Sequence, residues 1–280
     1  MTKIILRGAL ALAVALPGLL AQPKPKSPEE YEALKAMFGA ETPDARIAAA
    51  ENVLKKFADT QFKAVALYFE AASYQQKGDY EHTVVFGERT LEADPKHYQA
   101  MLMLATIIAQ HTKEFDLDRE EKLAQVEKYA KTALDLLKDA PKPNPNITDD
   151  QWTAAKKDFA AEAHAALGMG AMARKKNDVA ESEFKLAIDV ADKPDPAFMV
   201  RLGKVYSDDG KYDEAIAQFD KVMAMPDVNV QVKQVAQAER VRTIQKKNPA
   251  KPADAAPPAN PANPGPPNPT TCLLYTSRCV

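Results

Sequence analysis

Residues 201–226 read RLGKVYSDDGKYDEAIAQFDKVMAMP, and this stretch decides the fold. Leu202 and Tyr206 stand four residues apart before Gly210, and Ala215 and Phe219 stand four residues apart after it. Apolar residues at such intervals are typical of amphipathic helices, and an Asp-Gly pair is typical of a turn. The stretch therefore predicts two antiparallel helices joined by a tight turn.

The same pattern recurs along the chain at offsets near one repeat length or several. At an offset of 35 residues, Leu167, Gly168, Ala180 and Phe184 fall on Leu202, Gly203, Ala215 and Phe219. At an offset of 132, Tyr74, Gly78 and Tyr80 fall on Tyr206, Gly210 and Tyr212, and at 34, Ala66 and Ala71 fall on Ala100 and Ala105. Generic helices do not produce so many coincidences, so the sequence indicates a helical repeat.

These residues resemble the tetratricopeptide repeat, W-x2-L-G-x2-Y followed by a turn and A-x3-F-x2-A. In the last copy Met199 replaces the tryptophan and Val222 the final alanine. The resemblance implies an all-α fold, a right-handed solenoid of antiparallel helix pairs in which small residues let paired helices approach closely. The residues that it assigns to repeat packing are Ala71, Tyr74, Gly78, Tyr80, Leu167, Gly168, Ala180, Phe184, Leu202, Gly203, Tyr206, Ala215 and Phe219.

The resemblance also divides the chain. We expect a degenerate helix pair in residues 22–63, the repeat solenoid in residues 64–228 and a mostly polar capping helix in residues 229–247. One copy contains an insertion, residues 112–121, which delays its second helix.

Several helix starts carry a side-chain cap. Ser27-Pro28-Glu29-Glu30 and Thr148-Asp149-Asp150-Gln151 have the pattern of a capping box. Thr42-Pro43, Asp94-Pro95 and Asp195-Pro196 place a capping side chain before a proline at the first helical position.

Residues 1–21 have the order of a secretory signal peptide. Lys3 and Arg7 precede an apolar run of about thirteen residues, shorter than the roughly 20 that span a bilayer. The alternative is an uncleaved membrane anchor. We expect a periplasmic or secreted bacterial protein without stable membrane insertion after cleavage.

Both cysteines lie at the other end of the chain. Residues 248–271 are rich in Pro, Ala and Asn, and we expect a disordered tail. Residues 272–280, CLLYTSRCV, resemble a translated sequencing adapter, and we interpret them as an artefact; the alternative is a genuine C-terminal peptide. Without Cys272 and Cys279 the chain has no thiol for catalysis or for zinc.

Composition excludes several classes of protein. Glycine is scarce (10 of 280) and aromatic residues make up 7%, which argues against an all-β fold. The net charge of −2 gives no indication of nucleic-acid binding. The four histidines lack ligand spacing, and we find no catalytic motif, so we expect no cofactor, no metal and no enzyme activity.

What remains is a surface that binds a protein or peptide. In tetratricopeptide arrays the first helix of each pair lines a concave groove, so the resemblance implies a peptide- or helix-binding groove, with Tyr68 and Lys204 as the main contacts. Tyr68 and Leu102 could instead pack between repeats. The implied lining is Val65, Tyr68, Ala72, Gln75, Gln99, Leu102, Thr106, Ala197, Val200, Lys204 and Ser207.

The function expected from these observations is a non-catalytic protein–protein interaction scaffold outside the cytoplasm. Two alternatives stay open: an envelope assembly factor, or the docking module of an enzyme whose catalytic domain was lost by truncation after Thr271. The sequence does not identify the partner.

Overall fold

A computed structural model describes residues 24–144 and 146–249. Residues 1–21, the tail beyond residue 249 and the terminal CLLYTSRCV segment lie outside the described residues. The described part contains eleven helices: α1 (Pro28–Gly39), α2 (Pro43–Lys56), α3 (Lys63–Lys77), α4 (Tyr80–Ala93), α5 (Tyr98–His111), α6 (Arg119–Asp139), α7 (Asp149–Ala173), α8 (Asn177–Val190), α9 (Pro196–Asp208), α10 (Tyr212–Ala224) and α11 (Val230–Lys247).

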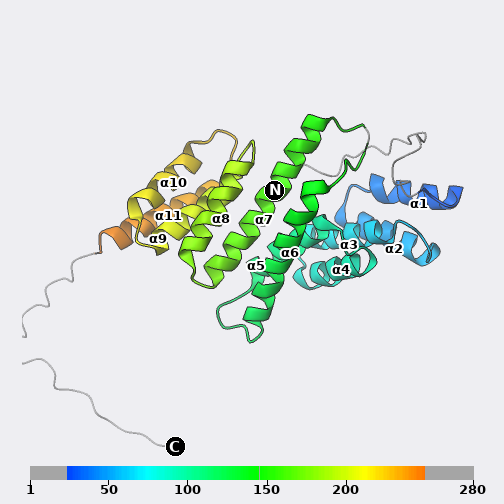
Figure 1. Ribbon diagram of the computed structural model, residues 1–280, viewed down its shortest axis with the longest axis horizontal. Helices are drawn as coiled ribbons and strands as arrows, with labels where there is room; N and C mark the ends of the chain where they lie inside the picture. The colour runs from blue at the N-terminus through cyan, green and yellow to red at the C-terminus, as the bar shows by residue number, and fades with distance from the viewer. Residues whose placement is uncertain (1–23, 145, 250–280) are drawn as a thin grey trace, which may run out of the picture. The chain divides into compact units, whose positions relative to one another are not determined.

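Consecutive helices pack as antiparallel neighbours, from α1 to α11 in chain order (Figure 1). The described part contains no strand, which confirms the all-α prediction and fits a solenoid of helix pairs. The degenerate first pair exists as α1 and α2, and the delayed second helix is α6. No helix of the described part is long and apolar enough to cross a membrane.

Helix α7 begins with the capping box that the sequence predicts. Thr148 Oγ1 accepts a hydrogen bond from the Gln151 amide at 3.2 Å, and Gln151 Oε1 accepts one from the Thr148 amide at 3.0 Å. At α1 only half of the predicted box forms. Ser27 Oγ accepts from the Glu30 amide at 3.1 Å, but Glu30 accepts from the Lys26 amide and the Thr60 hydroxyl. Glu30 therefore ties α1 to the loop before α3.

The prediction that Asp94-Pro95 starts a helix is wrong. Asp94 ends α4, and α5 begins at Tyr98 with His97 as its cap, whose Nδ1 accepts from the Ala100 amide at 3.2 Å. Asp94 instead accepts from the Lys96 amide at 3.0 Å and forms a turn of its own. The predicted caps Thr42 and Asp195 do form, at 3.2 Å and 2.8 Å.

Left-handed residues close three of the turns within pairs. Gly78 and Gly210 both have a φ of 76°. Lys175, at the corresponding point between α7 and α8, has a φ of 59°. Glycine adopts this region freely, whereas a side chain there is strained.

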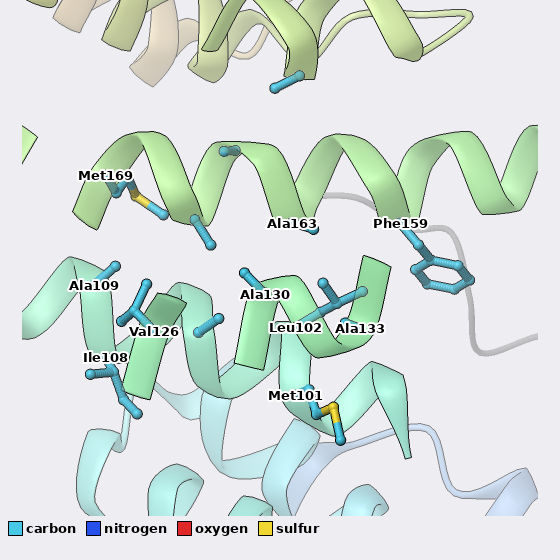
Figure 2. Close-up of a cluster of buried hydrophobic side chains, with 14 of the residues drawn as sticks. Met101, Leu102, Ile108, Ala109, Val126, Ala130, Ala133, Phe159, Ala163 and Met169 are labelled. Carbon is cyan, nitrogen blue, oxygen red and sulfur yellow. The ribbon is translucent and has the colours of Figure 1, made fainter. Parts of the chain in front are cut away.

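The largest apolar cluster lies between α5, α6 and α7 and continues into α8 and α9. Figure 2 shows Phe159, Ala163 and Met169 of α7 facing the side chains of α5 and α6. A smaller cluster joins α1, α2 and α3, and a third joins α9, α10 and α11. Each cluster is shared by neighbouring helices, as in other repeat proteins.

Glycines face aromatic rings where paired helices meet. A Cβ at Gly203 would lie 2.6 Å from Phe219, and a Cβ at Gly168 would lie 3.0 Å from Phe184. Both rings are completely buried. Only glycine therefore lets these rings pack directly against the first helix of the pair.

Helix α11 covers the last pair and has a mostly polar sequence, with three valines on its exposed faces. Its own residues Ala236 and Thr243 are buried. Val230, Val235 and Val241 are 67%, 51% and 41% exposed. The end of the array thus carries apolar side chains that a purely polar cap would not.

Candidate functional site

The first helix of each repeat pair contributes to one surface, which we call the first-helix face: the exposed parts of α3, α5, α7 and α9. Most of the predicted lining residues are accessible there. Gln75 and Lys204 are exposed, and the half-buried residues are Val65, Tyr68, Ala72, Gln99, Thr106 and Ala197.

Three predicted lining residues are buried instead, which corrects the sequence interpretation. Leu102 is 2% exposed, because α7 packs on α5 and takes it into the central cluster. Val200 and Ser207 are 8% and 5% exposed, because α11 lies over this side of α9. The Ser207 hydroxyl accepts a hydrogen bond from Thr243 Oγ1 at 2.9 Å. These residues support the scaffold rather than contact a ligand.

Aromatic rings extend the first-helix face beyond the residues predicted from the sequence. The rings of Tyr68 and His97 lie 4.8 Å apart, and those of Tyr98 and Phe159 lie 5.4 Å apart in an edge arrangement. Such contacts link α3 to the start of α5, and α5 to α7. They hold two tyrosine rings in fixed positions, with their hydroxyl groups available for polar contacts.

Glu162 of α7 is a carboxylate of this surface. Burial raises its pKa to about 7, and the negative charges of Asp158 and Asp195 act in the same direction. The side chain is nevertheless exposed to solvent. Glu162 is therefore a carboxylate that neighbouring helices crowd but that solvent, and hence a ligand, can reach.

Glu162 lies close enough to Tyr68 for its charge to act on the tyrosine hydroxyl. The pKa of Tyr68 is raised well above its usual range by burial, and next by the charge of Glu162. Burial raises the pKa of Tyr98 to about 12. Both hydroxyls therefore stay protonated and can donate hydrogen bonds at any physiological pH.

Two basic side chains lie on α9. Arg201 is half-buried, and burial lowers its pKa while the nearby Asp195 raises it. Lys204, a predicted main contact, lies 3.4 Å from Asp208 in an exposed ion pair, so its charge is partly offset. We call Tyr68, Tyr98, Glu162 and Arg201 the first-helix patch.

The sequence analysis missed three of these four residues, although the repeat register contains a signal for one. Glu162 stands 35 residues before Ala197, at the same repeat position as a predicted lining residue. Extending the register to this copy would have found it. Tyr98 and Arg201 occupy positions that are not predicted to face outward.

The histidines have structural partners. The His82 ring contacts Asp79 at 2.8 Å, and His164 contacts Glu183 at 2.8 Å. His97 caps α5, and His111 contacts the Ile107 carbonyl at 2.9 Å. Among the described residues no three His, Cys, Asp or Glu side chains are grouped to hold a metal ion.

Two clefts lie away from the first-helix patch. One, of about 690 Å³, lies between α6, α7 and α8, with Leu134, Ala160 and His164 in its lining. The other, of about 700 Å³, lies between the end of α10 and α11.

Solved structures with a similar fold include TTC0263, a thermophilic TPR protein of Thermus thermophilus. It is 19% identical over 77% of this chain and 98% of that one, with a TM-score of 0.52. An assembly chaperone of RpL4, Acl4, is 12% identical over 78% and 95%, with a TM-score of 0.41. The P58(IPK) TPR domain is 12% identical over 78% and 64%, with a TM-score of 0.30.

No protein-family model and no curated protein matches the sequence. The fold assignment rests on the likeness to TTC0263 together with the helical repeat itself. The chain has a tetratricopeptide-like fold, in which neighbouring helix pairs stack on one another.

Proposed function

We propose that this protein is a non-catalytic scaffold outside the cytoplasm that binds an extended or helical segment of another protein on its first-helix face. The carrying observation is that Tyr68 of α3, Tyr98 of α5 and Glu162 of α7 stand on successive first helices, which the Tyr68–His97 and Tyr98–Phe159 ring contacts join. Residues 1–21, with their basic start and short apolar run, support export.

The chemistry of the patch favours a partner segment that presents a positive charge beside an apolar side chain. Glu162, Asp158 and Asp195 outnumber Arg201 on this part of the surface. A lysine or arginine would offset their mutual repulsion and could lie against a tyrosine ring. Tyrosine is also common among the residues that dominate binding energy.

Capture from an envelope extract at pH 6 and pH 8 tests the proposal. With a Glu162 pKa of about 7, the carboxylate is mostly protonated at pH 6 and mostly charged at pH 8. Retention of a cationic partner should therefore increase with pH in the parent. It should depend less on pH in Glu162→Gln and fall at least tenfold in Tyr68→Ala, since loss of a central aromatic contact costs about 2 kcal/mol.

The matched control is Leu186→Ala on α8, a second helix of a pair, whose side chain is 48% exposed. Each variant is checked for helicity by circular dichroism. If folded Tyr68→Ala and Glu162→Gln retain every partner as the parent does, the first-helix patch is not the binding site.

A further inference from the structure

Glu70 of α3 occupies a repeat position at which the later copies carry leucine. At offsets of 34, 97 and 132 residues it falls on Leu104, Leu167 and Leu202. Leu104 and Leu202 are buried, and Glu70 is just as buried, at 1% exposure. Neither of its carboxylate oxygens has a hydrogen-bond partner among the described residues. A buried carboxylate in place of an apolar side chain costs free energy, so a role other than packing is expected of it.

The equivalent leucines show which way this repeat position faces. A Cβ at Gly87 of α4 would lie 2.8 Å from Leu104 of α5, so this leucine packs on the second helix of the preceding pair. Leu202 of α9 likewise belongs to the apolar cluster that contains Ala187 of α8. The side chain at this position therefore lies where one helix pair stacks on the pair before it.

By the same register, Glu70 lies at the interface between α3 and the first pair, α1 and α2. The charged groups that act on it are Glu51 and Lys55 of α2 and Arg89 of α4. Lys55 pairs with Glu51 at 2.8 Å, and the Arg89 guanidinium lies over the Phe86 ring, 5.0 Å from its centroid. Both cations near Glu70 thus have other contacts, and neither forms an ion pair with it in the described part.

The first pair is held mainly by α3. The apolar cluster that joins α1, α2 and α3 is separate from the largest cluster. Besides the Glu30 contacts, Lys77 Nζ lies 2.6 Å from Asp44, and Arg46 Nη2 donates to Gln76 Oε1 at 2.9 Å. The Lys77–Asp44 pair is solvent-exposed, and exposed pairs contribute little to stability. A terminal pair with one neighbour is the part of a repeat array that separates most easily.

We propose that ionisation of Glu70 releases α1 and α2 from α3, so that the N-terminal end of the array opens above neutral pH. The carboxyl proton passes to water, and no covalent bond within the chain changes. The charged carboxylate has no hydrogen-bond donor in the closed array, whereas water solvates it once α2 has moved away.

The direction of the pH dependence follows from burial. Burial raises the pKa of Glu70 to about 7 in the closed array, and exposure returns it to the ordinary value of 4.5. The open form therefore binds fewer protons, and opening becomes more favourable as pH rises. Tyr68 keeps its ring contact with His97 at the start of α5, so this release is separate from binding at the first-helix patch.

Amide hydrogen exchange of the full chain at pH 5.5 and pH 8 tests the proposal, with each rate divided by the intrinsic exchange rate at that pH. Protection of the buried amides of α2 should fall by at least about tenfold at pH 8, because the pKa is 4.5 in the open form and about 7 in the closed form. Protection of α8 and α9 should stay the same, since these helices do not contact the first pair.

Two variants assign the response to the carboxylate. Glu70→Leu restores the leucine of the later copies, and Glu70→Gln removes the charge at nearly the same size; in both, α2 should be equally protected at the two pH values. His82→Gln is the control for histidine, which also titrates near neutral pH, and should respond like the parent. Equal protection of α2 in the parent, a response that persists in Glu70→Gln or is lost in His82→Gln, or an equal response in α8 and α9 would each overturn the proposal.

Discussion

Glu70 of α3 is a buried carboxylate without a hydrogen-bond partner. Its side chain is 1% exposed, and both carboxylate oxygens lack a partner among the described residues. Burial raises its pKa to about 7, the charge of Glu51 acts in the same direction, and Arg89 and Lys55 oppose it. The folded protein therefore favours the protonated form of this group.

Stability should decrease with pH because of Glu70. A carboxyl group whose pKa is higher in the folded state binds more protons when folded, so its contribution is complete below the unfolded pKa of 4.5 and is lost as pH rises through about 7. The shift corresponds to roughly 3 kcal/mol at most. Chemical denaturation at pH 5 and pH 8 should show this loss in the parent and a smaller one in Glu70→Gln.

Glu92→Gln, on an exposed position of α4, is the control and should keep the pH dependence of the parent. Equal slopes in the parent and in Glu70→Gln would show that the buried carboxylate does not control stability.

At the scale of elements, the distance between neighbouring helices depends on individual glycines. Gly203 of α9 faces Phe219 of α10, and Gly170 of α7 faces Val126 of α6 at an ordinary contact distance of 3.5 Å for an added Cβ. There is no room for a methyl group at Gly203, whereas there is room for one at Gly170.

Gly203→Ala and Gly170→Ala should therefore change stability in opposite directions. The buried Phe219 ring cannot move aside, so Gly203→Ala should destabilise by about 1–3 kcal/mol through overpacking. Gly170→Ala places alanine in a helix interior without a clash and should stabilise by roughly 0.5–1 kcal/mol. Thermal melts of the two variants decide the matter, and shifts of the same sign would mean that the helix contacts are assigned wrongly.

At the scale of the whole helical array, stability is distributed unevenly. The cluster that begins between α5, α6 and α7 is the most extensive, whereas α11 buries only Ala236 and Thr243 among its described residues. In arrays of repeats each unit is stabilised mainly by its neighbours, so the ends have fewer stabilising contacts than the middle.

Amide hydrogen exchange should follow this distribution. We expect the slowest exchange in α5, α6 and α7 and faster exchange in α1 and α11. Gly203→Ala should speed exchange in α9, α10 and α11 and leave α3 and α4 unchanged, because the perturbation acts on adjacent units. Uniform protection from α1 to α11 would instead indicate one cooperative unit.

Structural features that depend on residues close together in the sequence could be predicted. Burial that depends on packing between distant helices could not be fixed from the sequence. The helix pairs, the cap at Thr148 and the turn at Gly210 follow from local patterns. For Leu102 the sequence left packing between repeats open as the alternative, and its burial is decided by how closely α7 approaches α5. Ser207 is buried for a similar reason, since Thr243 comes from a helix 36 residues further on.

Lys175 links a strained turn to the insertion beside it. It occupies a turn where two other pairs have glycine, and its left-handed backbone costs roughly 1–2 kcal/mol. The same side chain holds Glu114 of the insertion at 2.6 Å. The strained turn therefore carries the side chain that anchors the insertion. Shortening the insertion would leave the strain at Lys175 in place and remove the contact that accompanies it.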